Sequence, residues 1–312
     1  ITAMINEDDN VAGKTRDKSL VAYLSILVIL CAGFIVGAKA MGEKGLYLAQ
    51  AYMLTPALAA VLTRLFFYRN KFSDARLRLG KVKDYFRFWL FSLLIAAASF
   101  LVFYLIGAIK WDFTGETFLK NLAEQFKNSG QDINSGLPEG VTPKTMMWLL
   151  MAGQLTVLNI VPGLITGFGE EFGHRGFMYT RLKEHGFLLS IIVGGLIWFA
   201  WHLPLQLLIP AKDDFSTTQT ILNYFILAIG SVCTFAYLVY VFEKSQSIWV
   251  VSLAHIVINN ASAAFSYFII LQNQFLANAG LTITMLLVLF FGPGHYLFKI
   301  FKQQKPDISE QN

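Results

Sequence analysis

Eight apolar runs of about twenty residues constrain the fold of this sequence more than any other feature. A run of this length is what an α-helix needs to cross the hydrocarbon core of a bilayer, which is roughly 30 Å thick. Only helices and closed barrels satisfy every backbone polar group in lipid, and the alternating ten-residue pattern of a barrel is absent. We therefore predict an all-α, polytopic membrane protein with about eight transmembrane helices around a central polar cavity. The runs cover residues 19–41, 46–67, 87–109, 146–168, 187–202, 219–242, 247–271 and 280–300.

The composition supports a membrane class and gives no sign of a nucleic-acid partner. Hydrophobic residues make up 55% of the chain and charged residues only 14%, whereas about a quarter of a soluble domain is charged. The net charge of +5 comes largely from the connection between Arg64 and Arg87. Basic connections mark the cytoplasmic side of a membrane, so we expect both termini in the cytoplasm of a bacterium or archaeon. Cys31 and Cys233 lie inside apolar runs without a CxxC pattern, which indicates neither a disulfide framework nor a thiolate metal site.

The runs are expected to form one transmembrane domain over residues 19–301, with a frayed polar tail at 1–18 and a second polar tail at 302–312. The long connection 110–145 places apolar residues at helical spacing among polar ones, which predicts a short amphipathic helix at the membrane interface. No internal repeat is evident, although many transporters are built from two related halves.

A cluster of charged residues follows the fourth run, and it is the most informative stretch of the chain. Ionisable side chains inside a membrane cost on the order of 2.5–3.5 kcal/mol each on insertion scales, so they usually pair and usually function. Glu171 and Arg175 are four residues apart and are expected to form an ion pair, while Glu170 and His174 share the adjacent stripe. A fixed Glu171 leaves Glu170 free to titrate as a general base. The alternative is a cytoplasmic helix with ordinary surface ion pairs.

His202 closes the fifth run, and helical spacing predicts that it lies level with these carboxylates. Gly186 marks a turn; Glu171 lies 15 residues before it and His202 lies 16 after it. At 1.5 Å per residue, both are about 22–24 Å from the turn of an antiparallel hairpin. In the seventh run, His255 and Asn259 are four apart on one helix face. We expect the three elements to form one shared site, although an interfacial histidine and an interhelical hydrogen-bond clamp are the simpler alternatives for the last two.

The stretch from 146 to 185 is too long for one straight span, since it would extend about 60 Å as a helix. Either Pro162, Gly163, Gly167 and Gly169 break or kink it, or the true span is closer to 160–184. The second interpretation places Glu170 within the bilayer.

These residues resemble the CAAX protease and bacteriocin-processing family of intramembrane glutamate proteases, which includes the type II CAAX prenyl endopeptidase. The family pattern is Glu-Glu-x-x-x-Arg, then Phe-x-x-x-His, then His-x-x-x-Asn or Asp. This chain has Glu170-Glu171…Arg175, Trp198…His202 and His255…Asn259, and the resemblance covers about residues 146–271. Trp198 replaces the family's usual Phe, a change that we expect to affect local packing only.

The resemblance implies that Glu170 and His202 activate a water, that Glu171 and Arg175 orient the carboxylate, and that His255 and Asn259 donate hydrogen bonds to the oxyanion. It implies a membrane-associated protein or peptide as substrate, including prenylated CAAX-type proteins. We favour a site without a cofactor. Zinc held by Glu170, His202 and His255 is the alternative, because two imidazoles and a carboxylate are a known catalytic ligand set.

Two other classes of function remain open. The first is an ion- or proton-coupled carrier that uses the same Glu and His residues, and the second is a non-catalytic immunity or scaffold protein. The side from which substrate enters is also open. The basic connection puts the site in the non-cytoplasmic half, whereas a prenyl-CAAX protease should open to the cytoplasm.

Overall fold

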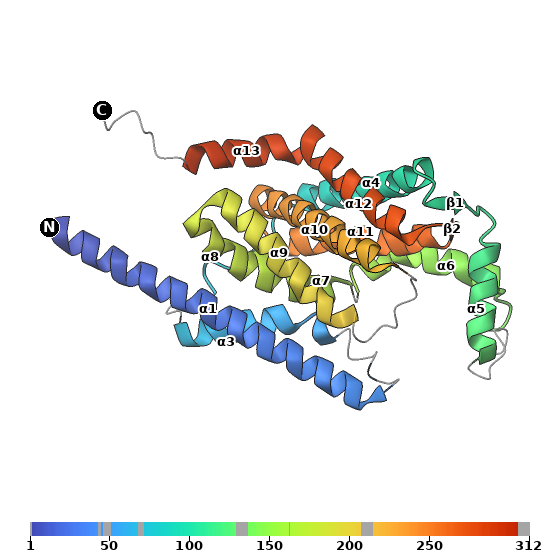
Figure 1. The fold of residues 1–312 in the computed structure, drawn as a ribbon, viewed down its shortest axis with the longest axis horizontal. Helices are drawn as coiled ribbons and strands as arrows, with labels where there is room; N and C mark the ends of the chain where they lie inside the picture. Colours follow the sequence, from blue (N-terminus) through green and yellow to red (C-terminus); the bar gives the residue numbers. More distant parts are fainter. Residues whose placement is uncertain are drawn as a thin grey trace.

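Six helices in the described part of the chain are long and apolar enough to cross a membrane (Figure 1). The computed structural model describes residues 2–42, 45, 51–67, 72–128, 137–161, 163–206 and 215–304. The predicted all-α, polytopic membrane fold is therefore confirmed. The six helices are α1 (Thr2–Ala40), α4 (Val82–Leu105), α9 (Phe187–Gln206), α10 (Thr217–Ser245), α11 (Ile248–Ser266) and α12 (Gln274–Phe291).

The expected count of eight spans is not confirmed within these residues. The run 280–300 is divided where α12 ends and α13 (Pro293–Gln304) begins, because proline lacks the N–H that would continue the helix. The run 46–67 contains α3 (Thr55–Phe67), whose 13 residues extend only about 20 Å. Residues 46–50 lie outside the described residues.

The fourth apolar run is broken in two. Helix α6 (Pro143–Leu155) ends at Thr156, a 3-10 turn η2 (Val157–Asn159) follows, and the helix resumes as α7 (Gly163–Gly173). The two parts are bent by 41°, so together they form a broken span or a re-entrant segment and a seventh spanning candidate. Pro162, which we expected at the break, lies outside the described residues.

The predicted break is present and ends at Gly163, where α7 begins, but Gly167 and Gly169 do not interrupt the helix as we expected. The glycines of α7 instead allow close packing on both of its sides. A Cβ added at Gly163 or Gly167 would lie within 2.6 Å of the Ile256 side chain on α11. One added at Gly173 would lie 2.4 Å from the backbone of Pro56 at the start of α3. Small residues at four-residue spacing let membrane helices approach in this way, so α7 is wedged between α3 and α11.

Helix α7 continues directly into a π-helical turn, η3 (His174–Tyr179), and then into α8 (Thr180–Leu182) and η4 (Lys183–His185). A π-turn widens the helix and is frequent at functional sites. The backbone carbonyl of Gly176 in η3 accepts a 2.7 Å hydrogen bond from the buried Arg64 of α3.

The basic connection between α3 and α4 is anchored by ion pairs to the ends of other helices. Asp74 pairs with both Arg64 and Arg181, so it joins α3 to α8. Glu243 near the end of α10 pairs with Lys183 at 2.8 Å. Charged contacts therefore hold this end of the bundle together.

The opposite end of the bundle carries a small cap, and it includes two strands that the all-α prediction did not contain. The strands β1 (Ile109–Trp111) and β2 (Ile269–Leu271) form one antiparallel pair. The amphipathic helix that we predicted after the third span is α5 (Glu116–Asn128), which lies across the end of the bundle beside the two strands (Figure 1). Its start is fixed by Asp112, whose carboxylate accepts a 2.8 Å hydrogen bond from the backbone N–H of Thr117.

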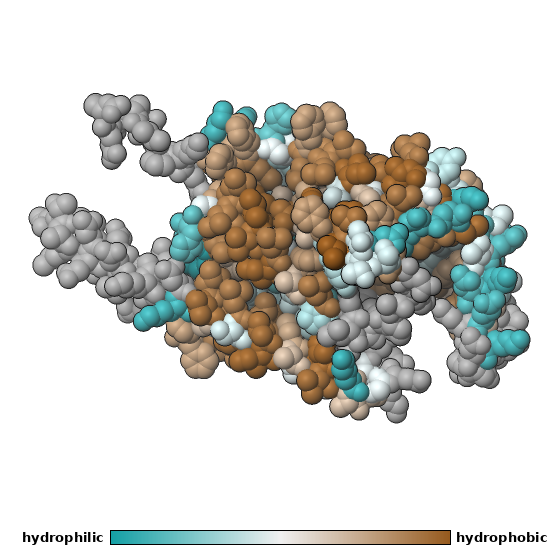
Figure 2. All heavy atoms as spheres, viewed as in Figure 1, coloured by the Kyte–Doolittle hydropathy of each residue, from teal (hydrophilic) through white to brown (hydrophobic). Residues whose placement is uncertain are grey.

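The molecular surface follows the same division. In Figure 2, apolar residues cover the middle of the molecule, and hydrophilic residues gather toward the two ends, including α5. Residues 2–18, which belong to the expected polar tail, are helical and continuous with the first span.

We predict that Gly173→Ala destabilises the protein, because its methyl group would meet the backbone of Pro56. Overpacking of this kind costs typically about 1–3 kcal/mol. Gly33→Ala is the matched control, since Gly33 is an exposed helical glycine with no atom within 4 Å of an added Cβ. Thermal unfolding in detergent should show a lower midpoint for Gly173→Ala and an unchanged or higher one for Gly33→Ala. Equal midpoints would contradict the proposed packing.

Candidate active site

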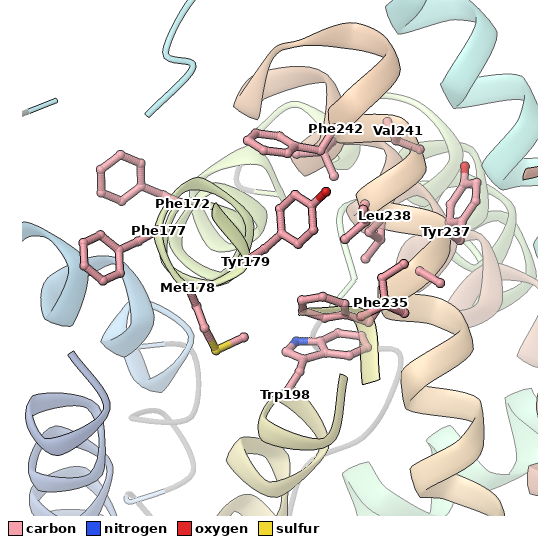
Figure 3. Close-up of a cluster of buried hydrophobic side chains, with 14 of the residues drawn as sticks. Phe172, Phe177, Met178, Tyr179, Trp198, Phe235, Tyr237, Leu238, Val241 and Phe242 are labelled. Carbon is pink, nitrogen blue, oxygen red and sulfur yellow. The ribbon is translucent and has the colours of Figure 1, made fainter. Parts of the chain in front are cut away.

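Four ionisable side chains of α7 and η3 are buried almost completely. Glu170 is 4% exposed, and Glu171, His174 and Arg175 are 0% exposed. Figure 3 shows this helix end-on, with the apolar side chains Phe172, Phe177, Met178 and Tyr179 extending from it into the surrounding core. This packing fixes the rotation of the helix, and with it the direction of the polar side chains.

Glu171 forms the centre of a buried, charged hydrogen-bond network. Its Oε1 accepts a 2.8 Å bond from Arg175 Nη1, which confirms the ion pair predicted from their spacing. The same oxygen lies 2.8 Å from Nδ1 of His255 on α11. Because a carboxylate only accepts, Nδ1 is the donor and the second ring nitrogen, Nε2, remains available.

The Arg175 guanidinium is also held between two aromatic rings. Its Cζ lies 4.9 Å from the ring centre of Trp198 on α9 and 4.2 Å from that of Phe235 on α10. These two rings lie side by side in Figure 3. Cation–π contacts strengthen when they are desolvated, so this buried cation is stabilised from two helices, α9 and α10, besides its own.

Glu170 faces the second imidazole. Its Oε2 lies 3.9 Å from Nε2 of His202, which is too long for a direct hydrogen bond but can be bridged by one water. His202 Nδ1 lies 2.8 Å from the carbonyl oxygen of Trp198. Since a carbonyl only accepts, Nδ1 carries the proton and Nε2 is directed at the carboxylate. The predicted proximity of His202 to the carboxylates is confirmed.

Trp198 forms a hydrogen bond in the site as well as packing contacts, so our expectation of a purely local packing effect was wrong. Its indole Nε1–H donates to Glu170 Oε2 at 3.3 Å. Phenylalanine has no such donor. Comparing Trp with Phe only as aromatic residues ignores the indole N–H, which is the feature that identifies this role.

Asn259 is the one predicted site residue that the structure does not connect to the others. It shares the helix face of His255, but its side chain is exposed and has no hydrogen-bond partner among the described residues. The neighbouring Asn260 instead donates to Asn159 at 2.8 Å. That bond ties α11 to the η2 turn where the fourth span is broken.

His174 is a further buried polar residue beside the site. Neither ring nitrogen has a hydrogen-bond partner among the described residues. The ring packs edge-on against Trp201, with the centroids 5.2 Å apart, and Trp201 in turn contacts His202. His174 thus makes no bond to Glu170, although the two share a stripe of the helix.

The two imidazoles of the zinc ligand set that we considered lie against different carboxylates. His202 faces Glu170, whereas His255 bonds to Glu171. Within the described residues, no group of three His, Cys, Asp or Glu side chains is placed to hold a metal ion.

Comparison with known proteins gives one match. Residues 152–261 match the family described as Type II CAAX prenyl endopeptidase Rce1-like, and this segment contains all six predicted site residues. A search of curated proteins found no match. The matched family is a protease family, and the apolar helices make the chain an integral, multi-pass membrane protein. The resemblance indicated by the three motifs is thus confirmed: over residues 152–261, the chain matches the Rce1-like family of type II CAAX prenyl endopeptidases.

Proposed function

We propose that this protein is an intramembrane endopeptidase in which Glu170 and His202 activate a water. The observation that carries the proposal is the 3.9 Å separation of Glu170 Oε2 and His202 Nε2, beside a second carboxylate that is already neutralised. Arg175 and His255 both hydrogen-bond to Glu171, so we assign the proton transfer to Glu170. Two carboxylates in different environments commonly take different roles in this way.

The reaction follows from these positions. Glu170 accepts a proton from the water, and the resulting hydroxide attacks the carbonyl carbon of the peptide bond. The tetrahedral intermediate then collapses, the C–N bond breaks, and Glu170 returns the proton to the leaving amine. A carboxylate that works first as base and then as acid needs no Ser or Cys nucleophile.

The oxyanion of the intermediate requires hydrogen-bond donors. His255 would supply one through Nε2–H in its protonated form, while Glu171 holds Nδ1 and so fixes the ring. The Asn259 amide, four residues along the same face, is the second donor that we propose. In this structure it is unbonded and exposed, so it would meet the substrate directly. Loss of one such donor typically costs about 10²–10³ in rate.

An apolar groove supports a lipidated substrate. It lies between α1 and α9, has a volume of about 440 Å³, and is bordered by Trp201 next to His202. Its other walls include Cys31, Ala32 and Ala200. A prenyl chain in this groove would place the attached peptide beside the proposed water, which agrees with the substrate class of the matched family.

A carrier is the second candidate, and the broken span beside buried ionisable residues favours it. The two functions differ in product. A carrier moves solute or ions across liposomes without cutting peptides, and a protease cuts peptides without flux.

We predict that Glu170→Gln and His202→Gln each reduce peptide cleavage by about 10²–10⁴, the usual contribution of a general base. Cleavage should be measured with purified protein in proteoliposomes, together with ion flux. Glu139→Gln is the control, because Glu139 is an exposed carboxylate outside the site. Full activity in Glu170→Gln would exclude the protease mechanism, and flux without cleavage would establish the carrier.

Trp198→Phe should lower kcat about tenfold with little change in KM. The substitution keeps a ring against Arg175 but removes the hydrogen bond to Glu170, and bonds to charged groups contribute about 1.5–3 kcal/mol. Trp249→Phe is the matched control, since its indole donates to the Leu77 carbonyl instead. An unchanged kcat in Trp198→Phe would show that the indole N–H does not position the base.

Ala32→Trp should fill the apolar groove and raise KM for a prenylated peptide by about tenfold or more. The same peptide without its prenyl group should show no such rise. Gly33→Trp is the control, because Gly33 is the next residue of α1, is exposed and is not part of the groove wall. If both peptides respond equally, the groove does not hold the lipid.

A further inference from the structure

One polar face of α11 connects the candidate active site to a second cavity at the other end of the helix. His255, Asn259, Ser262 and Ser266 follow the spacing of a single helix face. His255 belongs to the site, and Ser266 lines the cavity. The two residues are eleven apart, which corresponds to about 16 Å along the helix.

The second cavity has a volume of about 580 Å³ and lies beneath the cap formed by α5 and the two strands. Its polar side chains are all uncharged, and the rest of its wall is apolar. A cavity of this kind suits an uncharged ligand that carries both apolar groups and hydrogen-bonding groups, such as a stretch of peptide. The polar wall residues are Thr117, Asn121, Ser266 and Gln274.

Strand β2 presents a free backbone edge to this cavity. The Asp112 N–H donates to the Phe268 carbonyl, and the Gln272 N–H donates to the Ala108 carbonyl. Antiparallel pairs alternate between bonded and non-bonded positions, so Ile269 and Leu271 direct their backbone groups away from β1. Among the described residues, no backbone group of another element bonds to these two, and the Leu271 carbonyl accepts only a long, 3.5 Å bond from the Gln272 side chain.

We propose that this cavity is a substrate subsite, in which an extended, uncharged segment flanking the scissile bond pairs with the free edge of β2. An added strand gains affinity from main-chain hydrogen bonds and specificity from pockets for alternate side chains. An extended chain covers about 3.3 Å per residue. The residue that enters the cavity is therefore about five positions from the scissile bond. The proposal rests on the proposed protease function and adds how the peptide is recognised.

The first experiment compares two peptides that carry either two or eight residues on the same side of the scissile bond. In the native protein, the longer peptide should have a KM about tenfold lower. Ser266→Trp, which fills the cavity, should reduce this ratio to near one. Thr218→Trp, an exposed position on α10 outside the cavity wall, should preserve it. A ratio that is the same in the native protein and in Ser266→Trp would overturn the subsite.

The second experiment measures binding without cleavage, so that failure of the subsite is distinct from failure of the protease. A peptide with a photo-crosslinking residue five positions from the scissile bond is added to the Glu170→Gln protein in vesicles of neutral phospholipid. Crosslinks to α5 or β2 support the subsite, even if the native protein cleaves no peptide. Crosslinks elsewhere overturn it, as does capture of a photoactivatable phospholipid at this cavity in place of the peptide.

Discussion

The buried ion pair of Glu171 and Arg175 is the interaction on which the rest of this structure depends. Removing two charges from water costs several kcal/mol per ion, and their attraction compensates only when the remaining hydrogen-bonding groups are also paired. Here part of the compensation comes from other helices: His255 on α11, Trp198 on α9 and Phe235 on α10. Glu171 Oε2 and Arg175 Nε and Nη2 have no hydrogen-bond partner among the described residues, so the pair depends strongly on these contacts. The pair therefore specifies which helices surround α7, and it gives each of them one orientation. Loss of any partner leaves a charge buried without compensation, so this arrangement tolerates little variation.

The same packing separates two carboxylates that are adjacent in the chain. Consecutive residues of a helix point about 100° apart, so Glu170 and Glu171 face different neighbours. Glu171 meets a cation, and Glu170 faces an imidazole and an indole. The glycines that bring α7 against α3 and α11 make this possible, because a bulkier helix would keep both carboxylates away from their partners. The chemistry proposed for Glu170 thus depends on residues that have no side chain.

Local spacing was sufficient to predict the contacts that depend on one or two straight helices. The Glu171–Arg175 pair follows from a separation of four residues. The proximity of His202 to the carboxylates follows from the nearly equal separations of Glu171 and His202 from Gly186. Prediction failed where a third element decides the outcome. Gly167 was interpreted as a break because its packing partner on α11, Ile256, is about 90 residues away in the sequence. The bond between Asn260 and Asn159 was not foreseen, because it depends on the η2 turn lying beside α11. To predict the role of Trp198, the position of its indole nitrogen relative to Glu170 is needed, and hydropathy and aromatic character do not give that position.

Helix α3 has one further consequence, which concerns the bilayer. Its 13 residues extend about 20 Å, against a hydrocarbon core of about 30 Å, and it lies directly against α7. A bilayer adapts to a short hydrophobic element by thinning around it, at a modest cost per ångström. Hydrophobic mismatch at α3 would therefore lower the lipid headgroups toward the level of Glu170. For the proposed hydrolysis, thinning would shorten the path of water to Glu170. The length of α3 would then help to supply water, which is the second reactant besides the peptide.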